Sequence, residues 1–97
     1  MKVHWTNTAV EHLLSIYEYI SKDSPLYAQR MVDRLTQRSE QIATFPWSGR
    51  KVPEYEAENI REEIEESYRI IYRIKPNQLD VLGVIHSSQL LSLEFKE

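Results

Sequence analysis

The strongest constraint on the fold of this chain is the alternating stretch at residues 68–74. Read with the two-residue period of a β-strand, its side chains divide into two sets. One set is apolar or aromatic and the other is mainly cationic: Tyr68, Ile70, Tyr72 and Ile74 against Arg69, Ile71 and Arg73. β-Branched and aromatic residues suit a pleated, half-buried surface. The stretch therefore predicts a strand with one apolar face and one cationic face.

The residues that follow predict a hairpin. Lys75-Pro76-Asn77-Gln78 has the composition of a turn, because proline cannot donate to a strand ladder and asparagine tolerates tight turns. Residues 79–85 are apolar at all but two positions, as expected of a central strand, and they end at His86. The hairpin would combine two arginines on one face of a strand with an imidazole at the end of its partner. We expect a functional site there.

Two helices are predicted before this hairpin. Thr8, three residues before Glu11, resembles a capping box, and apolar residues at helical spacing follow to about Ile20. Ser24-Pro25 restarts a helix, with serine placed to cap and proline at the first helical position. Phe45-Pro46 ends it. The short connection indicates an antiparallel helical hairpin whose apolar stripes face the core.

An acidic run occupies residues 54–66 and holds seven of the fifteen acidic residues. It flanks and enters a predicted strand at residues 60–64. Two interpretations are open: a solvated edge strand whose charges discourage sheet-to-sheet aggregation, or a surface that faces a cationic partner. Lys2–Trp5 is predicted to be a short first strand, and residues 46–53 a loop. Residues 88–97 are expected to form a short final helix or a segment laid across the sheet.

Composition narrows the class of protein. Ninety-seven residues suit one domain, 1–97, with a single core. The absence of cysteine favours a reducing cytoplasm, and no apolar run approaches the roughly 20 residues that span a bilayer. The first residues contain no apolar signal core, so we expect them to belong to the folded protein. A net charge of −3 makes direct nucleic-acid binding unfavourable. No metal-ligand spacing or phosphate loop is present, and no cofactor is expected.

Several motifs in order give the chain a resemblance to a known superfamily. They are Phe45-Pro46-x-Ser48-Gly49-Arg50, Ile60-Arg61-Glu62, Tyr68-Arg69-Ile70-Ile71-Tyr72-Arg73 and Val84-Ile85-His86. This set resembles the RelE/ParE superfamily, the toxins of bacterial type II toxin–antitoxin modules. The resemblance implies an α+β fold of order β-α-α-β-β-β, with two helices on one face of a mainly antiparallel sheet. It also implies a cognate, ParD-like antitoxin as partner.

The superfamily contains two activities. RelE-like members cut messenger RNA on the ribosome, whereas ParE-like members inhibit DNA gyrase. The RelE pattern has a lysine-rich strand where this chain has the acidic residues 60–66, and an arginine near the position of Gln89. Both departures favour a gyrase inhibitor that is not an enzyme. A RelE-like endoribonuclease using Arg69 and His86, with a strand glutamate, is the alternative, and a degenerate toxin that only binds its antitoxin is a third.

The resemblance and the strand pattern together predict two sets of residues that contact other proteins. The target would contact Arg61, Arg69, Arg73 and His86. An antitoxin helix would lie in a groove beside the helical hairpin, lined by Leu14, Tyr17, Val32 and Leu35. Two structural alternatives stay open for the first set. Arg69 could pair with neighbouring strand glutamates, and His86 could be a strand-terminal residue hydrogen-bonded to backbone.

Overall fold

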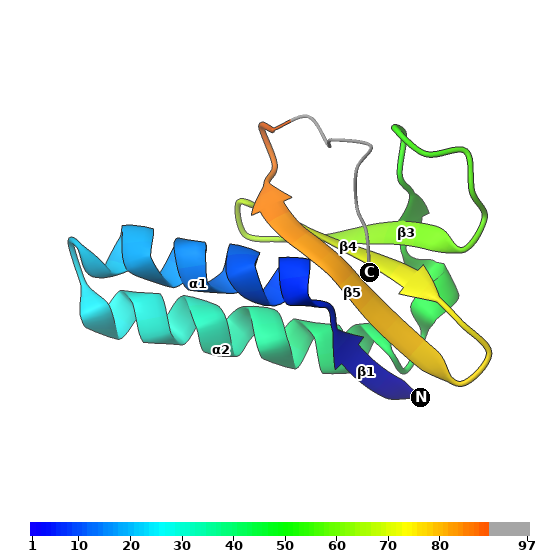
Figure 1. Cartoon of the computed structure of the whole chain (residues 1–97), viewed down its shortest axis with the longest axis horizontal. Helices are drawn as coiled ribbons and strands as arrows, with labels where there is room; N and C mark the ends of the chain where they lie inside the picture. The colour runs from blue at the N-terminus through cyan, green and yellow to red at the C-terminus, as the bar shows by residue number, and fades with distance from the viewer. Residues whose placement is uncertain (90–97) are drawn as a thin grey trace.

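The computed structural model describes residues 1–89, and the expectation for residues 90–97 lies outside them. The described elements are β1 (Lys2–Trp5), α1 (Asn7–Ser21), α2 (Pro25–Ile42), the 3₁₀ turn η1 (Pro46–Ser48), β2 (Arg50–Lys51), β3 (Ile60–Glu65), β4 (Tyr68–Ile74) and β5 (Gln78–His86). The strands form one sheet in the order β1-β5-β4-β3-β2 (Figure 1). β1 pairs parallel to β5 and the other pairs are antiparallel. The predicted α+β architecture is confirmed.

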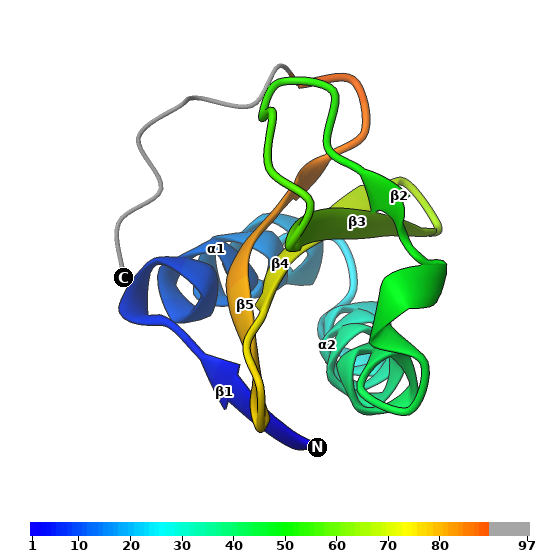
Figure 2. The ribbon, with the colours of Figure 1, turned by 90° about the vertical axis from the view of Figure 1, so that its right-hand side faces the viewer.

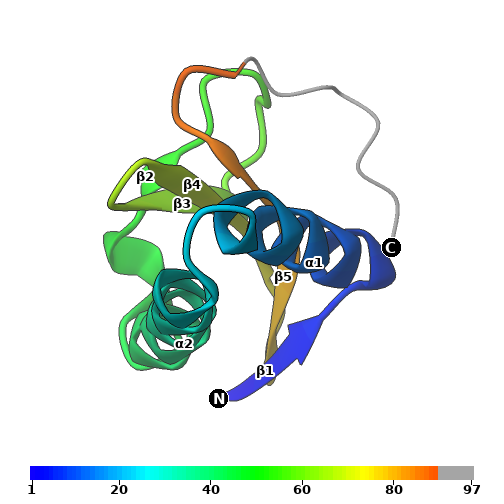
Figure 3. The same ribbon diagram turned by 90° about the vertical axis from the view of Figure 1, so that its left-hand side faces the viewer.

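The two helices run side by side and join through a short turn (Figure 3). Ser24 caps α2 as predicted, since its Oγ accepts a hydrogen bond of 3.1 Å from the Tyr27 amide, and Pro25 is the first helical residue. The predicted cap of α1 at Thr8 is wrong. Thr6 caps this helix instead, accepting from the Ala9 amide at 3.2 Å. Among residues 1–89, no helix is long and apolar enough to cross a membrane.

Thr6 is the better cap because it also fixes α1 to the sheet. Its Oγ1 donates to the Val81 carbonyl at 2.9 Å, and its amide donates to the same carbonyl at 3.1 Å. One buried threonine thus continues the pairing of β1 with β5 and begins the helix. A local capping pattern cannot reveal this, because the second partner lies 75 residues away.

The main core fills the space between the helices and the sheet. It contains Ala9, Met31, Leu35, Ile42, Ile70, Tyr72, Ile74, Leu79, Val81 and Val84. The apolar face predicted for β4 therefore packs against the helices. α2 ends at Ile42, three residues before the predicted end.

A second, smaller core lies on the opposite face of the sheet. Val52, Ile60, Ile71 and Leu82 are buried there, and Tyr55, Ala57 and Ile85 pack against them. The loop at residues 52–58 supplies part of this cover, and Figure 2 shows it on the far side of β3 from α2. The face that carries Arg69 is thus partly covered, where the sequence predicts an open cationic surface.

A β-bulge in β5 changes which way its last residues point. Ile71 pairs with Gly83 but the next residue, Tyr72, pairs with Val81, so Leu82 is extra. A one-residue shift moves every later side chain to the other face of the sheet. Beyond the bulge, His86 lies opposite Tyr68 on the helix-covered face. A regular hairpin would have placed His86 on the face of Arg69.

Candidate partner-binding surfaces

Arg69 is buried, and carboxylates and a carbonyl surround its guanidinium. Its Nη1 and Nη2 donate to the two carboxylate oxygens of Glu54 at 3.0 and 2.9 Å, and its Nε donates to Glu62 at 2.7 Å. Nη1 also reaches the carbonyl of Gln89 at 3.2 Å. The hydrogen bond to Glu54, followed by the interactions with Glu62, raises the pKa of Arg69 against the opposing effect of desolvation. Arg69, on β4, therefore joins loop 52–58, β3 and the segment that follows β5.

Glu62 binds two cations at once. Its carboxylate has no exposed surface and pairs with Arg69 on β4 and with Arg50 on β2. A buried carboxylate is tolerated when cations and hydrogen bonds satisfy its oxygens. The alternative in which Arg69 pairs with strand glutamates thus describes the observed geometry.

Much of the remaining acidic run also pairs with cations of this chain. Arg38 of α2 lies 3.1 Å from Glu63 and 3.5 Å from Glu65, and Arg34 pairs with Glu66. These pairs fasten α2 to β3 and to the turn after it. The expectation of an edge strand is wrong, because β2 covers part of β3 and makes it the second strand from the edge.

The four residues expected to contact a target do not form one site. The pairing of β3 with β4 places Arg61 opposite Tyr72, on the face that Tyr68 and His86 also share. Arg69 and Arg73 lie on the other face, at the ends of the second core. Alternation therefore divides the predicted set into two pairs, and the bulge in β5 is what separates His86 from Arg69 and Arg73.

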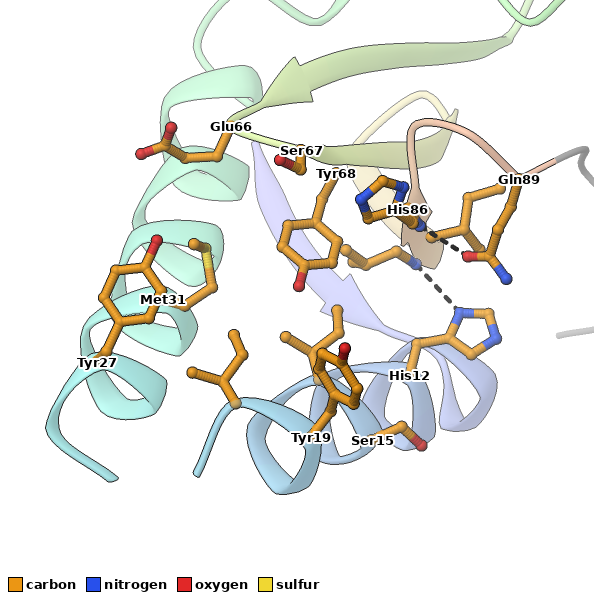
Figure 4. A pocket seen from close by; sticks show the side chains of 14 residues that line it. His12, Ser15, Tyr19, Tyr27, Met31, Glu66, Ser67, Tyr68, His86 and Gln89 are labelled. Atoms are coloured by element: carbon orange, nitrogen blue, oxygen red, sulfur yellow. Dashed lines mark hydrogen bonds between the residues drawn. The ribbon is translucent and has the colours of Figure 1, made fainter. Parts of the chain in front are cut away.

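A groove of about 670 Å³ opens on the helix-covered side (Figure 4). It lies between α1, the first turns of α2, the start of β4 and the end of β5. Ile16, Ile20 and Met31 give it an apolar lining, while Tyr19, Tyr27 and Tyr68 surround them. Burial raises the pKa of the Tyr68 phenol.

Beside this groove, polar side chains accept hydrogen bonds from backbone amides at the edge of β5. β1 pairs with β5 only as far as Val81, so the edge beyond it needs other partners. The Val84 amide donates to His12 Nδ1 at 3.1 Å, and the His86 amide donates to Gln89 Oε1 at 2.8 Å (Figure 4). Because His12 Nδ1 accepts, the neutral ring carries its proton on Nε2. Burial lowers the pKa of His12, which favours that neutral form.

His86 is held by its neighbours at the end of β5. Its ring makes an edge contact with Tyr68, with centroids 5.9 Å apart. Its Nδ1 lies 2.7 Å from Ser88 Oγ and accepts from the Ser88 amide at 3.2 Å. The alternative of a strand-terminal histidine bound to backbone thus fits the structure.

The residues expected to line an antitoxin groove lie elsewhere on the hairpin. Leu35 is fully buried in the main core, so it cannot line an open surface, and its assignment is corrected. Leu14 is exposed, whereas Tyr17 and Val32 are half-buried, and none of the three lines the groove described above. Helical periodicity identifies the apolar stripes of the two helices, but it does not show where the strands leave a groove beside those helices. The signal that could have located the groove is the pair Tyr19 and Tyr27, which flanks the turn between the helices.

The order of elements on a mixed five-stranded sheet agrees with the architecture that the resemblance to RelE/ParE toxins implies. Residues 3–91 match the family model described as the ParE toxin of the type II toxin–antitoxin system parDE. The chain belongs to this family, and the predicted membership of the RelE/ParE superfamily is confirmed.

Two relatives are similar over nearly their full lengths. Toxin RelE2 of Caulobacter vibrioides is 30% identical over 89 residues, which cover 92% of this chain and 98% of the relative. Putative toxin Y4kP of Sinorhizobium fredii is 33% identical over 90 residues, covering 91% of this chain and 90% of the relative. One relative thus carries a RelE name although the family model is ParE.

Two solved structures share the fold. The chromosomal ParDE toxin–antitoxin system from P. aeruginosa superposes with a TM-score of 0.73 at 21% identity, covering 89% of this chain and 95% of that chain. The toxin–antitoxin complex RelBE2 from Mycobacterium tuberculosis gives a TM-score of 0.63 at 21% identity, covering 88% and 95%. Both are toxin–antitoxin assemblies, and at this identity they establish the fold.

Proposed function

We propose that this toxin is ParE-like, that it inhibits DNA gyrase, and that a ParD-like antitoxin neutralises it. The observation that carries the proposal is the burial of Arg69 between Glu54 and Glu62. A RelE-like ribonuclease would need this cation at the scissile phosphate. The proposal assigns no catalytic residue, and it places the protein in the cytoplasm together with its target.

The surroundings of Arg69 oppose a role in RNA cleavage. A site that stabilises a phosphorane needs donors aimed at the position where charge develops. The donors of Arg69 are directed at Glu54, Glu62 and a carbonyl instead. A phosphate that approached would also meet the negative charge of the two carboxylates at short range.

The position of His86 opposes the same role. A general acid or base must come within hydrogen-bond reach of the proton that it transfers. Arg69 and His86 lie on opposite faces of the sheet because of the bulge in β5. One phosphate therefore cannot be held by the arginine and reached by the imidazole in this arrangement.

The groove supports the antitoxin as partner. Its apolar lining and three tyrosines suit the apolar face of a helix or an extended segment from a partner protein. Tyrosine contributes a large, rigid contact surface with a polar end, a combination that is enriched at interfaces. Two solved relatives of this fold are toxin–antitoxin assemblies.

Two assays on purified protein test the choice of target. We expect inhibition of supercoiling by DNA gyrase, with accumulation of cleaved DNA, and no cutting of messenger RNA in a translating extract. His86 is exposed, so its truncation should leave the fold intact. Ribosome-dependent cuts that disappear in His86→Ala would overturn the proposal and favour the ribonuclease. Antitoxin binding without either activity would identify a degenerate toxin.

A further inference from the structure

Three arginines follow one another at four-residue intervals along α2: Arg30, Arg34 and Arg38. Residues four apart lie on the same side of a helix, one turn after the other. Arg34 and Arg38 pair with glutamates within residues 63–66. Arg30 is exposed and, among residues 1–89, its side chain makes no ion pair or hydrogen bond. The row of cations therefore extends one turn beyond its carboxylate partners.

Arg30 lies at the edge of the groove, on the side that α2 provides. Tyr27, three residues before it, lines the groove, and so does Glu66, the partner of Arg34 (Figure 4). Side chains three and four residues apart on a helix are neighbours, so Arg30 is next to both Tyr27 and Arg34. A segment that binds in the groove against Tyr27 therefore comes within reach of the Arg30 guanidinium.

The carboxylates beside Arg30 are bound to other side chains. Asp33, three residues further along α2, accepts a hydrogen bond of 3.0 Å from Gln29. Glu66 is bound by Arg34. The charge of Arg30 is therefore available to a partner, and its guanidinium can bind a carboxylate through two parallel hydrogen bonds. A free cation at the edge of an apolar groove complements a segment that carries a carboxylate beside apolar side chains.

We propose that the antitoxin segment in the groove carries an aspartate or glutamate that pairs with Arg30. The inference rests on the proposed function, in which an antitoxin binds this groove. The apolar side chains of the same segment cover Ile16, Ile20 and Met31. Charge pairs at the rim of an interface contribute more to the choice of partner than to bulk affinity. Arg30 thus distinguishes the cognate antitoxin from segments that are only apolar.

The experiment measures, by calorimetry, the binding of the small protein encoded beside the toxin gene, which serves as the antitoxin. Arg30→Glu reverses the charge, and Lys2→Glu makes the same change at an exposed lysine of β1 outside the groove. We expect Arg30→Glu to weaken association about tenfold, most strongly at low salt, and Lys2→Glu to weaken it less than about twofold. Each acidic residue of the antitoxin is then changed to lysine in turn, and one of these changes should restore binding to Arg30→Glu. Melting temperatures are measured for every variant.

The possible results separate this inference from the proposed function. Binding restored by one charge-swapped pair, with unchanged melting temperatures, supports the inference. Binding that Arg30→Glu leaves unchanged or weakens no more than Lys2→Glu does, or a loss that no lysine substitution restores, overturns it while antitoxin binding stands. Self-association of the toxin that Arg30→Glu abolishes would assign the cation to a second copy of this chain and also overturns it. An antitoxin that does not bind the wild-type protein overturns the proposed partner and this inference with it.

Discussion

Arg69 and Glu62 form an ion pair inside the molecule, with Nη2 of the arginine 2.6 Å from Oε1 of the carboxylate. The pair connects β4 to β3, and Glu54 attaches loop 52–58 to the same guanidinium. A target that bound Arg69 would have to displace two carboxylates and release this loop. The pair is therefore a structural element that holds loop 52–58, β3 and β4 together.

Substitution of this arginine should cost stability. Arg69→Ala leaves the buried carboxylate of Glu62 without one of its two cations and releases Glu54 from its bidentate pair. We expect the free energy of unfolding to fall by about 3–5 kcal/mol, because removing one partner of a buried ion pair is costly. Urea denaturation measures the change. Arg30→Ala, on the exposed surface of α2, is the control and should change stability by less than about 0.5 kcal/mol. A loss of toxicity in Arg69→Ala with unchanged stability would contradict this assignment.

A side chain at Gly49 would collide mainly with the hydroxyl of Tyr72. A Cβ at Gly49 would collide with Tyr72 Oη and come within 2.9 Å of the Glu62 carbonyl. We expect Gly49→Ala to lower the free energy of unfolding by about 1–3 kcal/mol, as overpacking does. Tyr72→Phe removes the hydroxyl, so the double variant should lose less than the sum of the single losses. Additive losses in urea denaturation would show that the two side chains do not compete for this space.

The sequence predicts the elements of this fold better than the assembly of its site. Alternation at residues 68–74 correctly identifies β4 and its apolar face, because that pattern is a local property of the backbone. Which face His86 occupies depends on the extra residue Leu82 in β5, and no local pattern marks that bulge. The single extra residue Leu82 therefore places Arg69 and His86 on opposite faces of the sheet, so the predicted arginine–histidine site does not form.

The prediction of an open cationic face on β4 is wrong for a reason that does not involve the bulge. The charge of Arg69 is evident in the sequence, but its neutralisation depends on Glu54, a loop residue 15 positions earlier, and on Glu62 across the strand pair. The acidic run is evident in the sequence, and a pairing of Arg69 with strand glutamates is one of the interpretations that the sequence leaves open. The choice between this pairing and an open surface depends on where loop 52–58 lies, and sequence periodicity does not determine the position of a loop.

His12 should make stability depend on pH below neutrality. Its Nδ1 accepts from the Val84 amide, and burial lowers its pKa from the ordinary value of 6.5. The folded state thus binds this proton less readily than the unfolded state does. The contribution is fully present above about pH 6.5 and is lost as the pH falls toward the lower, folded pKa. His12→Asn keeps an acceptor that does not titrate, so urea denaturation from pH 7.5 to 5 should show a smaller loss than in wild type. Parallel profiles would contradict the role of His12.

Two substitutions distinguish antitoxin binding in the groove from antitoxin binding on the outer side of the hairpin. Tyr27 lines the groove and is 50% exposed, whereas Leu14 lies outside it and is 57% exposed, so truncation of either should leave the fold intact. If the antitoxin occupies the groove, Tyr27→Ala removes an aromatic contact and should weaken association at least tenfold by calorimetry, or about 1.4 kcal/mol. Leu14→Ala should then change the dissociation constant by less than about twofold. The reverse pattern would mean that the antitoxin lies across the outer side of α1, as the apolar stripe of Leu14 and Tyr17 predicts, and that the groove serves another partner.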